Sequence, residues 1–598
     1  MGVPADARHS RRARQPAPSA RGSDPRRKRD QAARSASVNS AYTAVEPGPW
    51  CPRSYTAFKI LLIVRLSSGL WSHIGDCDET YNYWEPLHFF LYGRGFQTWE
   101  HSPEYALRSY TYILLHLVPA WLYDKLLNPP PVYVFFFVRC ILALVCTGAE
   151  VYWIRGIRQQ IGPNVARLTL AILVGSAGMF VAGCALLPAS TSMWLSMVAM
   201  GAWAQGHYPL AIFCTAGSTF LSWPFAAILG LPIALDVLVR RRRWSLFVVW
   251  SAISTVVLLV PQIWLDSAYY GRSVVAPWNI ISYNIFTSHG PDLYGVADLR
   301  FYLINASLNF NIAFPLSLVS GPCLLLTYGW ANKNSPSTNL ASRLLQLMGF
   351  YVWILIFFYQ PHKEERFLYP IYPLIAFGAA TTIDCLEKVA GQWVFNVKKG
   401  HYTDHTSHGS AFMVICIMLL GLSRSVALYK NYGGSFNAWL QISHLPFEAP
   451  DVEESMTTYT QVCVGKEWHR FPSSFFLPSQ HWAMRFIRSE FRGQLPATYS
   501  SHVNGTYETR NIFNDLNQEE MDRYTNIEDC DYLVDLDNEK ESEFEPNYSQ
   551  FPDWTVVHSF PFIDNEKSNG LFKAFYVPIL SEQVTFYHNY NILKRNKG

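Results

Sequence analysis

The sequence predicts a polytopic α-helical membrane protein with a bundle of about 11 (10–13) membrane-crossing helices and a small α/β domain near the C-terminus. Half of the 598 residues are hydrophobic, and several apolar runs approach the roughly 20 residues that cross a hydrocarbon core. These runs are apolar all round, whereas a core helix of a soluble protein carries one apolar stripe. The longest examples are Pro131–Ile154, Ser245–Leu265 and Ser410–Tyr429. The chain therefore divides into residues 1–55, which are polar, 56–429, which are apolar, and 430–598, which resemble a soluble domain.

Residues 1–55 form a basic stretch in which arginines alternate with Ser, Ala and Pro. They contain no apolar core before Tyr55, so we do not interpret them as a cleaved signal peptide. A nucleic-acid-binding arm is the weaker interpretation, and we expect no nucleic-acid partner. We expect a disordered cytosolic tail whose charge orients the protein in the membrane.

The expected crossings place the remaining charges on two sides of a membrane. Segment 208–239 contains Pro224 and Pro232, so it forms either one kinked crossing or two short pieces. As one crossing it leaves Arg240–Arg243 in the cytosol, although Arg155 and Arg158 then lie on the wrong side. We prefer this count because it unites the polar loops 76–110, 266–299 and 360–367 and the tail 430–598 on the lumenal side. The crossings are 56–74, 110–127, 131–154, 165–184, 186–204, 208–239, 244–265, 300–328, 340–359, 368–388 and 409–429.

The first polar loop, 76–110, begins with three acids, Asp76, Asp78 and Glu79. On a helix Asp78 and Glu85 would share a face, seven residues apart. Many aromatic residues make the loop amphipathic, so we expect it to lie at the membrane interface. A carboxylate beside an apolar wall can have a raised pKa and act as a general base. The alternative is an ordinary interfacial loop with solvated acids.

The second polar loop, 360–367, concentrates charge between two apolar segments, where charge is costly unless something polar binds. His362, Lys363 and Arg366 supply cationic donors that suit a phosphate or pyrophosphate. Glu364 and Glu365 can orient those cations or bind hydroxyl groups. The alternative is a cluster of salt bridges with a purely structural role.

The tail 430–598 reads as a small mixed α/β domain, with strand-like runs at Val462–Val464, Tyr532–Val534 and Ala574–Ile579. Cys463 and Cys530 are its only cysteines, and in an oxidising lumen we expect them to form a disulfide. The sequons at Asn504 and Asn547 are candidate glycosylation sites. Acceptor recognition and structural support are both open as roles for this domain.

Several motifs carry a family resemblance that spans about residues 56–593. The string His362–Pro370, preceded by the acidic loop, resembles the dolichyl-phosphate-mannose-dependent mannosyltransferases of glycosyltransferase family 22. Further stretches resemble the α-1,2-mannosyltransferases that extend lipid-linked oligosaccharide in N-glycan assembly. These stretches are Asp76–Pro86, Gly95–Glu100, His289–Gly295, Ser423–Leu428 and Cys463–Ser474.

The resemblance implies a GT-C fold in the endoplasmic reticulum membrane, with its active site at the lumenal face. It implies dolichyl-phosphate mannose as donor, a dolichyl-pyrophosphate oligosaccharide as acceptor, and an inverting single displacement. Asp78 matches the acid of the family's first loop and is our choice of base, with Asp76 and Glu79 as alternatives. His362, Lys363 and Arg366 form the expected donor-phosphate group. We expect no cofactor and no metal, because cationic side chains can stabilise the leaving phosphate.

Three rival functions compete with this interpretation. The first is mannosylation of glycosylphosphatidylinositol, but the resembling enzymes with that activity, like those that attach an α-1,6-mannose, carry other residues at the position of Glu365. A transporter buries polar residues in mid-membrane and often contains inverted repeats, and we detect no repeat. A non-catalytic subunit has no need of both an acidic and a cationic lumenal loop.

Overall fold

The structure is a computed structural model that describes residues 49–287, 291–330, 337–397, 400–446, 459–500, 505–508 and 512–596. Residues 49–598 form one compact unit, which contains all the elements discussed below. Most of the predicted basic tail and Asn504 of the candidate glycosylation site lie outside the described residues.

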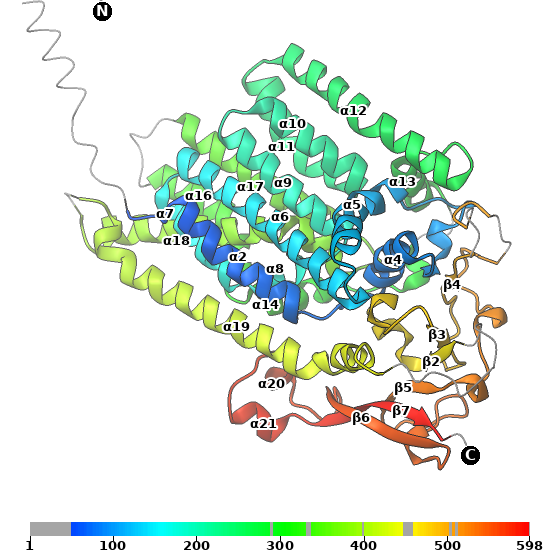
Figure 1. The fold of residues 1–598 in the computed structure, drawn as a ribbon. Helices are drawn as coiled ribbons and strands as arrows, with labels where there is room; N and C mark the ends of the chain where they lie inside the picture. Colours follow the sequence, from blue (N-terminus) through cyan, green and yellow to red (C-terminus); the bar gives the residue numbers. More distant parts are fainter. Residues whose placement is uncertain are drawn as a thin grey trace, which may run out of the picture. The chain divides into compact units, whose positions relative to one another are not determined.

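Long helices form the main body of the described chain (Figure 1). Four helical stretches are long and apolar enough to cross a membrane: Pro131–Gln160, Trp244–Tyr270, Leu340–Phe357 and Thr403–Ile442. On the second of these, Val248, Val256 and Val260 are more than half exposed, as suits a helix that faces lipid. The prediction of a helical protein with several apolar spans is therefore confirmed. The long helices are α2 Ser54–Trp71, α5 Tyr110–Leu127, α6 Pro131–Gln160, α9 Pro188–Ala204, α12 Trp244–Tyr270, α17 Ser337–Phe357, α18 Tyr372–Trp393 and α19 Thr403–Ile442.

Shorter elements connect or interrupt these helices, and prolines start or break many of them. They are α7 Pro163–Gly175, α8 Ala177–Ala182, α10 Tyr208–Gly217, α11 Leu231–Leu235, α13 Ala276–Phe286, α14 Leu299–Phe310, α15 Ala313–Leu318, α16 Ser320–Trp330, α20 Gly570–Ala574 and α21 Leu580–Val584. The prefix η marks 3-10 and π-helices.

Helix α5 does not run across the bundle, so the predicted crossing at 110–127 is wrong. At its start, Thr111 N donates to Asp266 Oδ1 at 2.9 Å, and near its end Asp124 Oδ1 accepts from the Tyr92 hydroxyl at 2.8 Å. Tyr92 lies in the first polar loop, and Asp266 lies near the end of α12 that packs on this loop. Both ends of α5 therefore lie at the same end of the bundle, and its exposed Leu115, Val118 and Leu122 suit a helix lying in a membrane interface.

Segment 208–239 runs across the bundle and returns, so our single-crossing count is also wrong here. The Tyr208 ring lies 5.0 Å from the Arg241 guanidinium, which brings the two ends of the segment together. Its middle, Phe220–Pro224, lines a small cavity with Tyr83 and Ser109 of the first polar loop. The chain reverses at Trp223, whose backbone is in the extended conformation and which precedes η4 Pro224–Gly230.

The two errors cancel, and together they remove the misplaced arginines. Near the end of α6, the Tyr152 hydroxyl contacts His207 Nδ1 at 3.1 Å, beside Tyr208. Arg155 and Arg158 follow Tyr152 on α6, so they lie at the same end of the bundle as Arg240–Arg243. The polar loops remain together at the opposite end. The arginine-rich end of the bundle and the end with the polar loops are thus better separated than the crossings counted from the sequence implied.

A buried ion pair joins helices α2 and α6 inside the bundle. Arg65 on α2 contacts Glu150 on α6 at 2.6 Å, and both side chains are fully buried. Arg65 also donates to the carbonyl oxygens of Leu173 and Met179, which fixes α2 against α7 and α8. Removing one partner of such a pair costs roughly 3–5 kcal/mol, so the pair specifies how these helices pack. The apolar helices α2 and α6 therefore hold a pair of charges inside the bundle.

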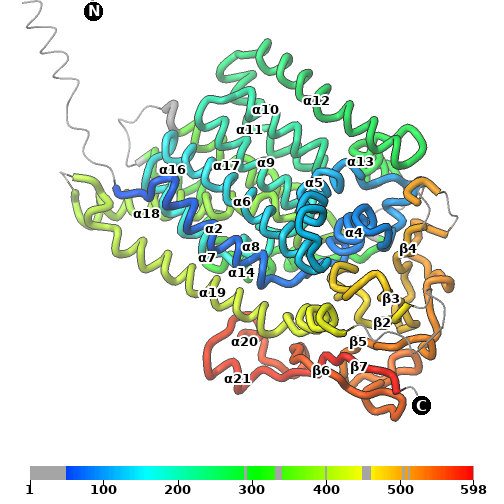
Figure 2. Tube along the Cα trace, viewed as in Figure 1, coloured from blue at the N-terminus to red at the C-terminus, as the bar shows by residue number. Residues whose placement is uncertain are grey.

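The C-terminal domain contains a five-stranded mixed sheet in the order β3-β2-β5-β7-β6. Strand β2 is parallel to β3 and β5, and β7 is antiparallel to β5 and β6. The two strand-like runs at 462–464 and 532–534 lie in β2 and β5, whereas the run at 574–579 follows α20 and is not a strand. In Figures 1 and 2, α19 leads into this domain and packs on β6. The strands are β2 Thr460–Val464, β3 Trp482–Phe486, β5 Tyr532–Asp537, β6 Trp554–Ile563 and β7 Tyr587–Arg595.

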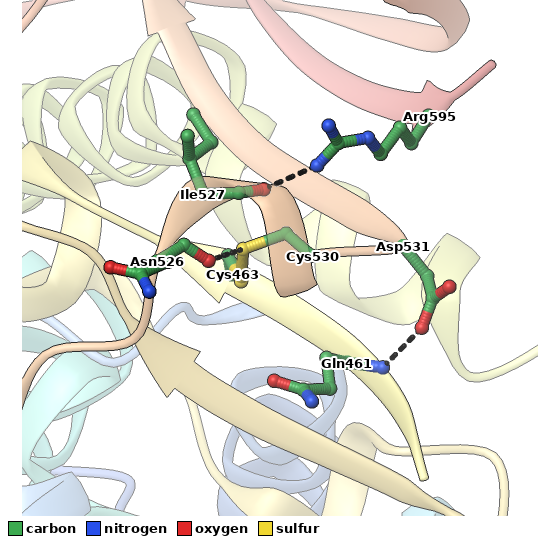
Figure 3. The surroundings of a disulfide bond; sticks show 7 residues. All are labelled: Gln461, Cys463, Asn526, Ile527, Cys530, Asp531 and Arg595. Atoms are coloured by element: carbon green, nitrogen blue, oxygen red, sulfur yellow. Dashed lines mark hydrogen bonds between the residues drawn. A yellow bond between two sulfur atoms is a disulfide. The ribbon is translucent and has the colours of Figure 1, made fainter. Parts of the chain in front are cut away.

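A disulfide joins Cys463 on β2 to Cys530, just before β5 (Figure 3). Beside it, Arg595 donates to the carbonyl oxygen of Ile527 at 2.9 Å, and Gln461 N donates to Asp531 Oδ2 at 2.9 Å. These contacts join β2, β5 and β7 around the Cys463–Cys530 disulfide that the sequence predicted.

Candidate active site

The first polar loop forms a helical stretch that changes type along its length. Asp76 caps α3 Cys77–Glu79 by accepting from Asp78 N at 2.9 Å. The π-helix η1 Thr80–Trp84 follows, and α4 Glu85–Tyr92 completes the stretch. π-Helical turns occur frequently at functional sites. Here the π-helix lies between Asp78 and Glu85, and its wider turn directs their side chains toward different neighbours.

Arg366 brings the two polar loops together at one end of the bundle. It lies at the start of η7 Glu365–Ile371, and its Nη2 contacts Asp78 Oδ2 at 2.5 Å. Its Nη1 lies 3.4 Å from Asp76 Oδ2, and its Nη2 also contacts Glu364. The arginine side chain is only 10% exposed, so most of its surface faces these three carboxylates. We call Asp76, Asp78, Glu364 and Arg366 the acid–arginine cluster.

His362 and Lys363 fasten the second polar loop to the connector 266–299. His362 Nε2 lies 2.9 Å from Glu364 Oε1, and His362 Nδ1 contacts the Gly295 carbonyl oxygen at 2.8 Å. Lys363 Nζ donates to the carbonyl oxygens of Ala297 and Gln360. The connector therefore lies beside the cluster, and Lys363 is largely engaged with backbone oxygens.

Glu365 points into a separate polar group. Its carboxylate accepts from Asn305 Nδ2 at 2.9 Å and from Asn309 Nδ2 at 2.8 Å, both on α14. The Tyr372 hydroxyl donates to it at 3.3 Å. Glu365 thus joins α14 to α18, and among the described residues its carboxylate makes no hydrogen bond to the acid–arginine cluster.

The structure does not bring Glu79 and Glu85 to Arg366. Glu79 is buried, and its Oε1 accepts from Leu186 N and from the Trp84 indole, each at 3.0 Å. Glu85 is fully buried and accepts from Phe96 N and from residues of the C-terminal domain. Our expectation that Glu79 is a candidate base, and that Glu85 shares a face with Asp78, therefore finds no support in the geometry.

The cluster perturbs the titration of its members. Burial, together with the charges of Asp78 and Glu364, raises the pKa of Asp76 to about 7, although Arg366 opposes this shift. Burial also raises the pKa of Glu364, but Arg366 and His362 outweigh burial and lower it to about 2. Burial lowers the pKa of His362, yet its contacts with Glu364 leave that pKa above the ordinary 6.5. Carboxyls with such different affinities for protons suit an acid–base site.

Sequence reasoning missed a second ion pair beside the cluster. Arg108 donates to both carboxylate oxygens of Glu100, at 3.1 and 2.8 Å, and to the Tyr83 hydroxyl at 3.1 Å. All three residues belong to the first polar loop. A cation eight residues after an acid in this loop was the available signal. The pair holds Arg108 and Glu100 in fixed positions at the same end of the bundle.

The ligand atoms of Asp76, Cys77 and Asp78 lie within 4.8 Å of one another, close enough to hold a cation. The guanidinium of Arg366 already contacts both carboxylates and supplies a positive charge there.

At the candidate glycosylation site Asn547, the amide Nδ2 donates to Asp537 Oδ1 at 2.5 Å.

The fold and the site together define a multi-span membrane protein whose buried acids and cations meet at one end of the bundle. Residues 56–478 match the model of the Alg9-like mannosyltransferase family. The α-1,2-mannosyltransferase Alg9 of Drosophila melanogaster is 45% identical, over 92% of this chain and 88% of its own length. Human ALG9 is 44% identical over 92% of this chain and 90% of its own. This chain belongs to the Alg9-like mannosyltransferase family.

Solved structures also resemble the chain. The crystal structure of ArnT from Cupriavidus metallidurans bound to undecaprenyl phosphate covers 72% of this chain and 85% of its own, at 12% identity and a TM-score of 0.46. From the family and its relatives, the predicted mannosyltransferase is confirmed, and the transporter and the non-catalytic subunit are set aside.

Proposed function

We propose that this chain transfers mannose from dolichyl-phosphate mannose, in α-1,2 linkage, to a dolichyl-pyrophosphate oligosaccharide during N-glycan assembly. The relatives from fly and human are α-1,2-mannosyltransferases, which supports the linkage. The observation that carries the proposal is the acid–arginine cluster, in which Arg366 of the second polar loop contacts Asp76 and Asp78 of the first.

In the proposed reaction the acceptor 2-hydroxyl attacks the anomeric carbon of the donor. Asp78 takes the hydroxyl proton as the new carbon–oxygen bond forms. The bond between that carbon and the phosphate oxygen breaks, and dolichyl phosphate leaves with the electron pair. Arg366 and His362 stabilise the charge on the departing phosphate. A β-linked donor thereby gives an α-linked product in one inverting displacement, without a covalent enzyme intermediate.

The distribution of basic residues supports an active site on the lumenal side. Arg155, Arg158 and Arg240–Arg243 lie at the bundle end opposite the cluster. Because cytosolic loops carry an excess of arginine and lysine, we assign that end to the cytosol. The site then faces the lumen of the endoplasmic reticulum. The corrected path, with α5 in the interface and segment 208–239 crossing twice, keeps the proposed GT-C bundle at about 11 crossings.

Mannosylation of glycosylphosphatidylinositol is the rival activity. GPI mannosyltransferase 3 of Yarrowia lipolytica is 27% identical over 58% of this chain and 66% of its own length. This similarity is lower and shorter than that to the α-1,2-mannosyltransferases above, so the N-glycan acceptor is favoured.

The test is incubation of the purified full-length protein with dolichyl-phosphate mannose and a defined lipid-linked oligosaccharide. We expect one or more mannoses to be added and then removed by an α-1,2-specific mannosidase. A matched reaction offers a glycosylphosphatidylinositol precursor as acceptor. Transfer to the precursor alone, or a product that resists the mannosidase, would overturn the proposal.

A further inference from the structure

A cavity of about 420 Å³ lies between the first polar loop and the C-terminal domain, apart from the acid–arginine cluster. Its walls come from the end of α4, from the residues after α5, and from β3 with the segment that precedes it. The volume falls within the roughly 300–1,000 Å³ typical of small-molecule sites. The aromatic lining residues are Tyr92, Phe96, Tyr459, Trp482 and Tyr499.

Arg485 on β3 lines this cavity with unused hydrogen-bond donors. Within the described part of the chain, its guanidinium has no hydrogen-bond or ion-pair partner. Arg94, which also lines the cavity, is engaged: it donates to the Tyr459 hydroxyl at 2.6 Å and to the Gln480 carbonyl oxygen. Arginine carries five donors and no acceptor, so Arg485 is suited to a ligand that offers oxygen acceptors.

The balance of charge favours a neutral ligand with hydroxyl groups over a phosphate. Asp124 also lines the cavity, and its carboxylate accepts from the Tyr92 hydroxyl at 2.8 Å. Phosphate sites usually gather several free cations, whereas Arg485 faces a wall that contains a carboxylate. Aromatic rings beside donors and acceptors provide both apolar faces and polar edges, which matches the surface of a sugar.

The cavity lies far from the proposed reaction centre along the same helical stretch. This stretch begins near Asp78 and ends at Tyr92, which lines the cavity. At about 1.5 Å per residue it spans roughly 20 Å. A ligand held at both places must therefore contain several sugar residues.

We propose that this cavity binds sugar residues of the acceptor oligosaccharide that lie remote from the reacting mannose. The inference rests on the proposed function, because that function supplies an acceptor of the required length. It also assigns the C-terminal domain a role in acceptor recognition through Arg485 and Tyr459. Binding energy from such a remote part of a substrate raises kcat/KM only when that part is present.

The test compares two acceptors on the full-length protein: the complete lipid-linked oligosaccharide, and an alkyl disaccharide that contains only the reacting mannose and its neighbour. Arg485→Gln should raise the KM for the complete acceptor about tenfold, as expected for a lost charged hydrogen bond. The KM for dolichyl-phosphate mannose and the rate with the disaccharide should stay unchanged. Tyr459→Ala should act in the same direction.

Arg488→Gln is the matched control, because Arg488 follows closely in sequence but contacts Glu519 and the Phe544 ring instead of the cavity. A KM for the complete acceptor unchanged by both Arg485→Gln and Tyr459→Ala would overturn the inference. The inference would also be overturned if the variants lost as much activity with the disaccharide as with the complete acceptor. It would likewise be overturned if inorganic pyrophosphate competed with the complete acceptor in the wild-type protein but not in Arg485→Gln. If the wild-type protein used neither acceptor, the proposed function itself would fail, which is a distinguishable result.

Discussion

Arg366 and Asp78, 288 positions apart in the chain, are joined by a 2.5 Å contact between Nη2 and Oδ2. This contact places the proposed base beside the cation that is proposed to face the leaving phosphate. Arg366 also holds the Asp78 carboxylate in place in a site that is partly withdrawn from water. The pair therefore makes each partner's role depend on the other.

We predict that Asp78→Asn lowers kcat by on the order of a hundredfold or more, because the amide cannot accept the acceptor proton. Asp76→Asn should retain much more activity, since Asp76 caps α3 and lies farther from Arg366. Initial rates with purified variants, normalised to folded protein, check this. The reverse order, with Asp76→Asn inactive and Asp78→Asn near wild type, would make Asp76 the base.

We predict that Arg366→Lys impairs transfer although it conserves charge. Lysine is a point charge and cannot offer the planar pair of donors of Arg366, in which Nη1 faces Asp76 and Nη2 faces Asp78 and Glu364. His362→Ala should reduce the rate as well, with little change in thermal stability. Lys363→Met should act mainly on stability, because Lys363 bonds to backbone oxygens. A normal rate per folded molecule for both Arg366→Lys and His362→Ala would refute the phosphate assignment.

The pH dependence of donor binding follows from His362. Its pKa lies above 6.5 because Glu364 outweighs the effect of burial. The imidazolium charge is therefore present below that raised pKa and is lost as pH rises through it, so the KM for the donor should increase in alkaline solution. Glu364→Gln lowers the pKa of His362 and should move this increase to lower pH. A donor KM that stays flat between about pH 6 and 9, or a shift to higher pH in Glu364→Gln, contradicts the assignment.

The disulfide between Cys463 and Cys530 closes a loop with a sequence separation of 67 residues. A loop of this length should contribute roughly 4 kcal/mol to the stability of the C-terminal domain. We expect mass spectrometry of non-reduced protein to find the linked peptides, and Cys463→Ala to lower the melting temperature. Cys214→Ala, at a free and buried cysteine, serves as control. Alkylation of both cysteines in the native protein would exclude the bond.

The sequence predicted the meeting of the two polar loops because one topological count placed both at the same membrane face. That count survived two errors, at α5 and at segment 208–239, only because they cancelled. An apolar run alone does not show whether a helix crosses a membrane or lies along its interface, and the run in α5 was interpreted as a crossing. The exposed stripe that includes Leu115 and Val118 is a property of packing, so it appears only in the structure.

The roles of Glu79 and Glu85 were beyond prediction for a different reason. A regular helix places Asp78 and Glu85 on one face, but the π-helix Thr80–Trp84 widens the turn between them. No propensity of those five residues indicates a π-helix. The partners of Glu85 come from Ser473 and Ser474, almost 400 positions away, and only tertiary packing brings them near.

Glu85 fastens the first polar loop to the C-terminal domain. Its carboxylate accepts from Ser473 Oγ at 2.9 Å, Ser474 N at 2.6 Å, Ser474 Oγ at 2.8 Å and Phe96 N at 3.1 Å. Burial raises the pKa of Glu85, but four donors favour its ionised form. Glu85→Gln replaces an acceptor by an NH₂ group that faces donors, so we predict a loss of about 2–4 kcal/mol in stability.

Thermal unfolding of the detergent-solubilised protein measures this loss, and limited proteolysis should release the C-terminal domain earlier from Glu85→Gln than from wild type. Glu104→Gln is the control, because Glu104 is exposed in the same loop and should change stability by less than about 0.5 kcal/mol. Since Glu85 follows Asp78 along one helical stretch, loosening it should also displace the base and lower kcat. Equal melting temperatures for Glu85→Gln and Glu104→Gln would show that the carboxylate does not hold the domain in place.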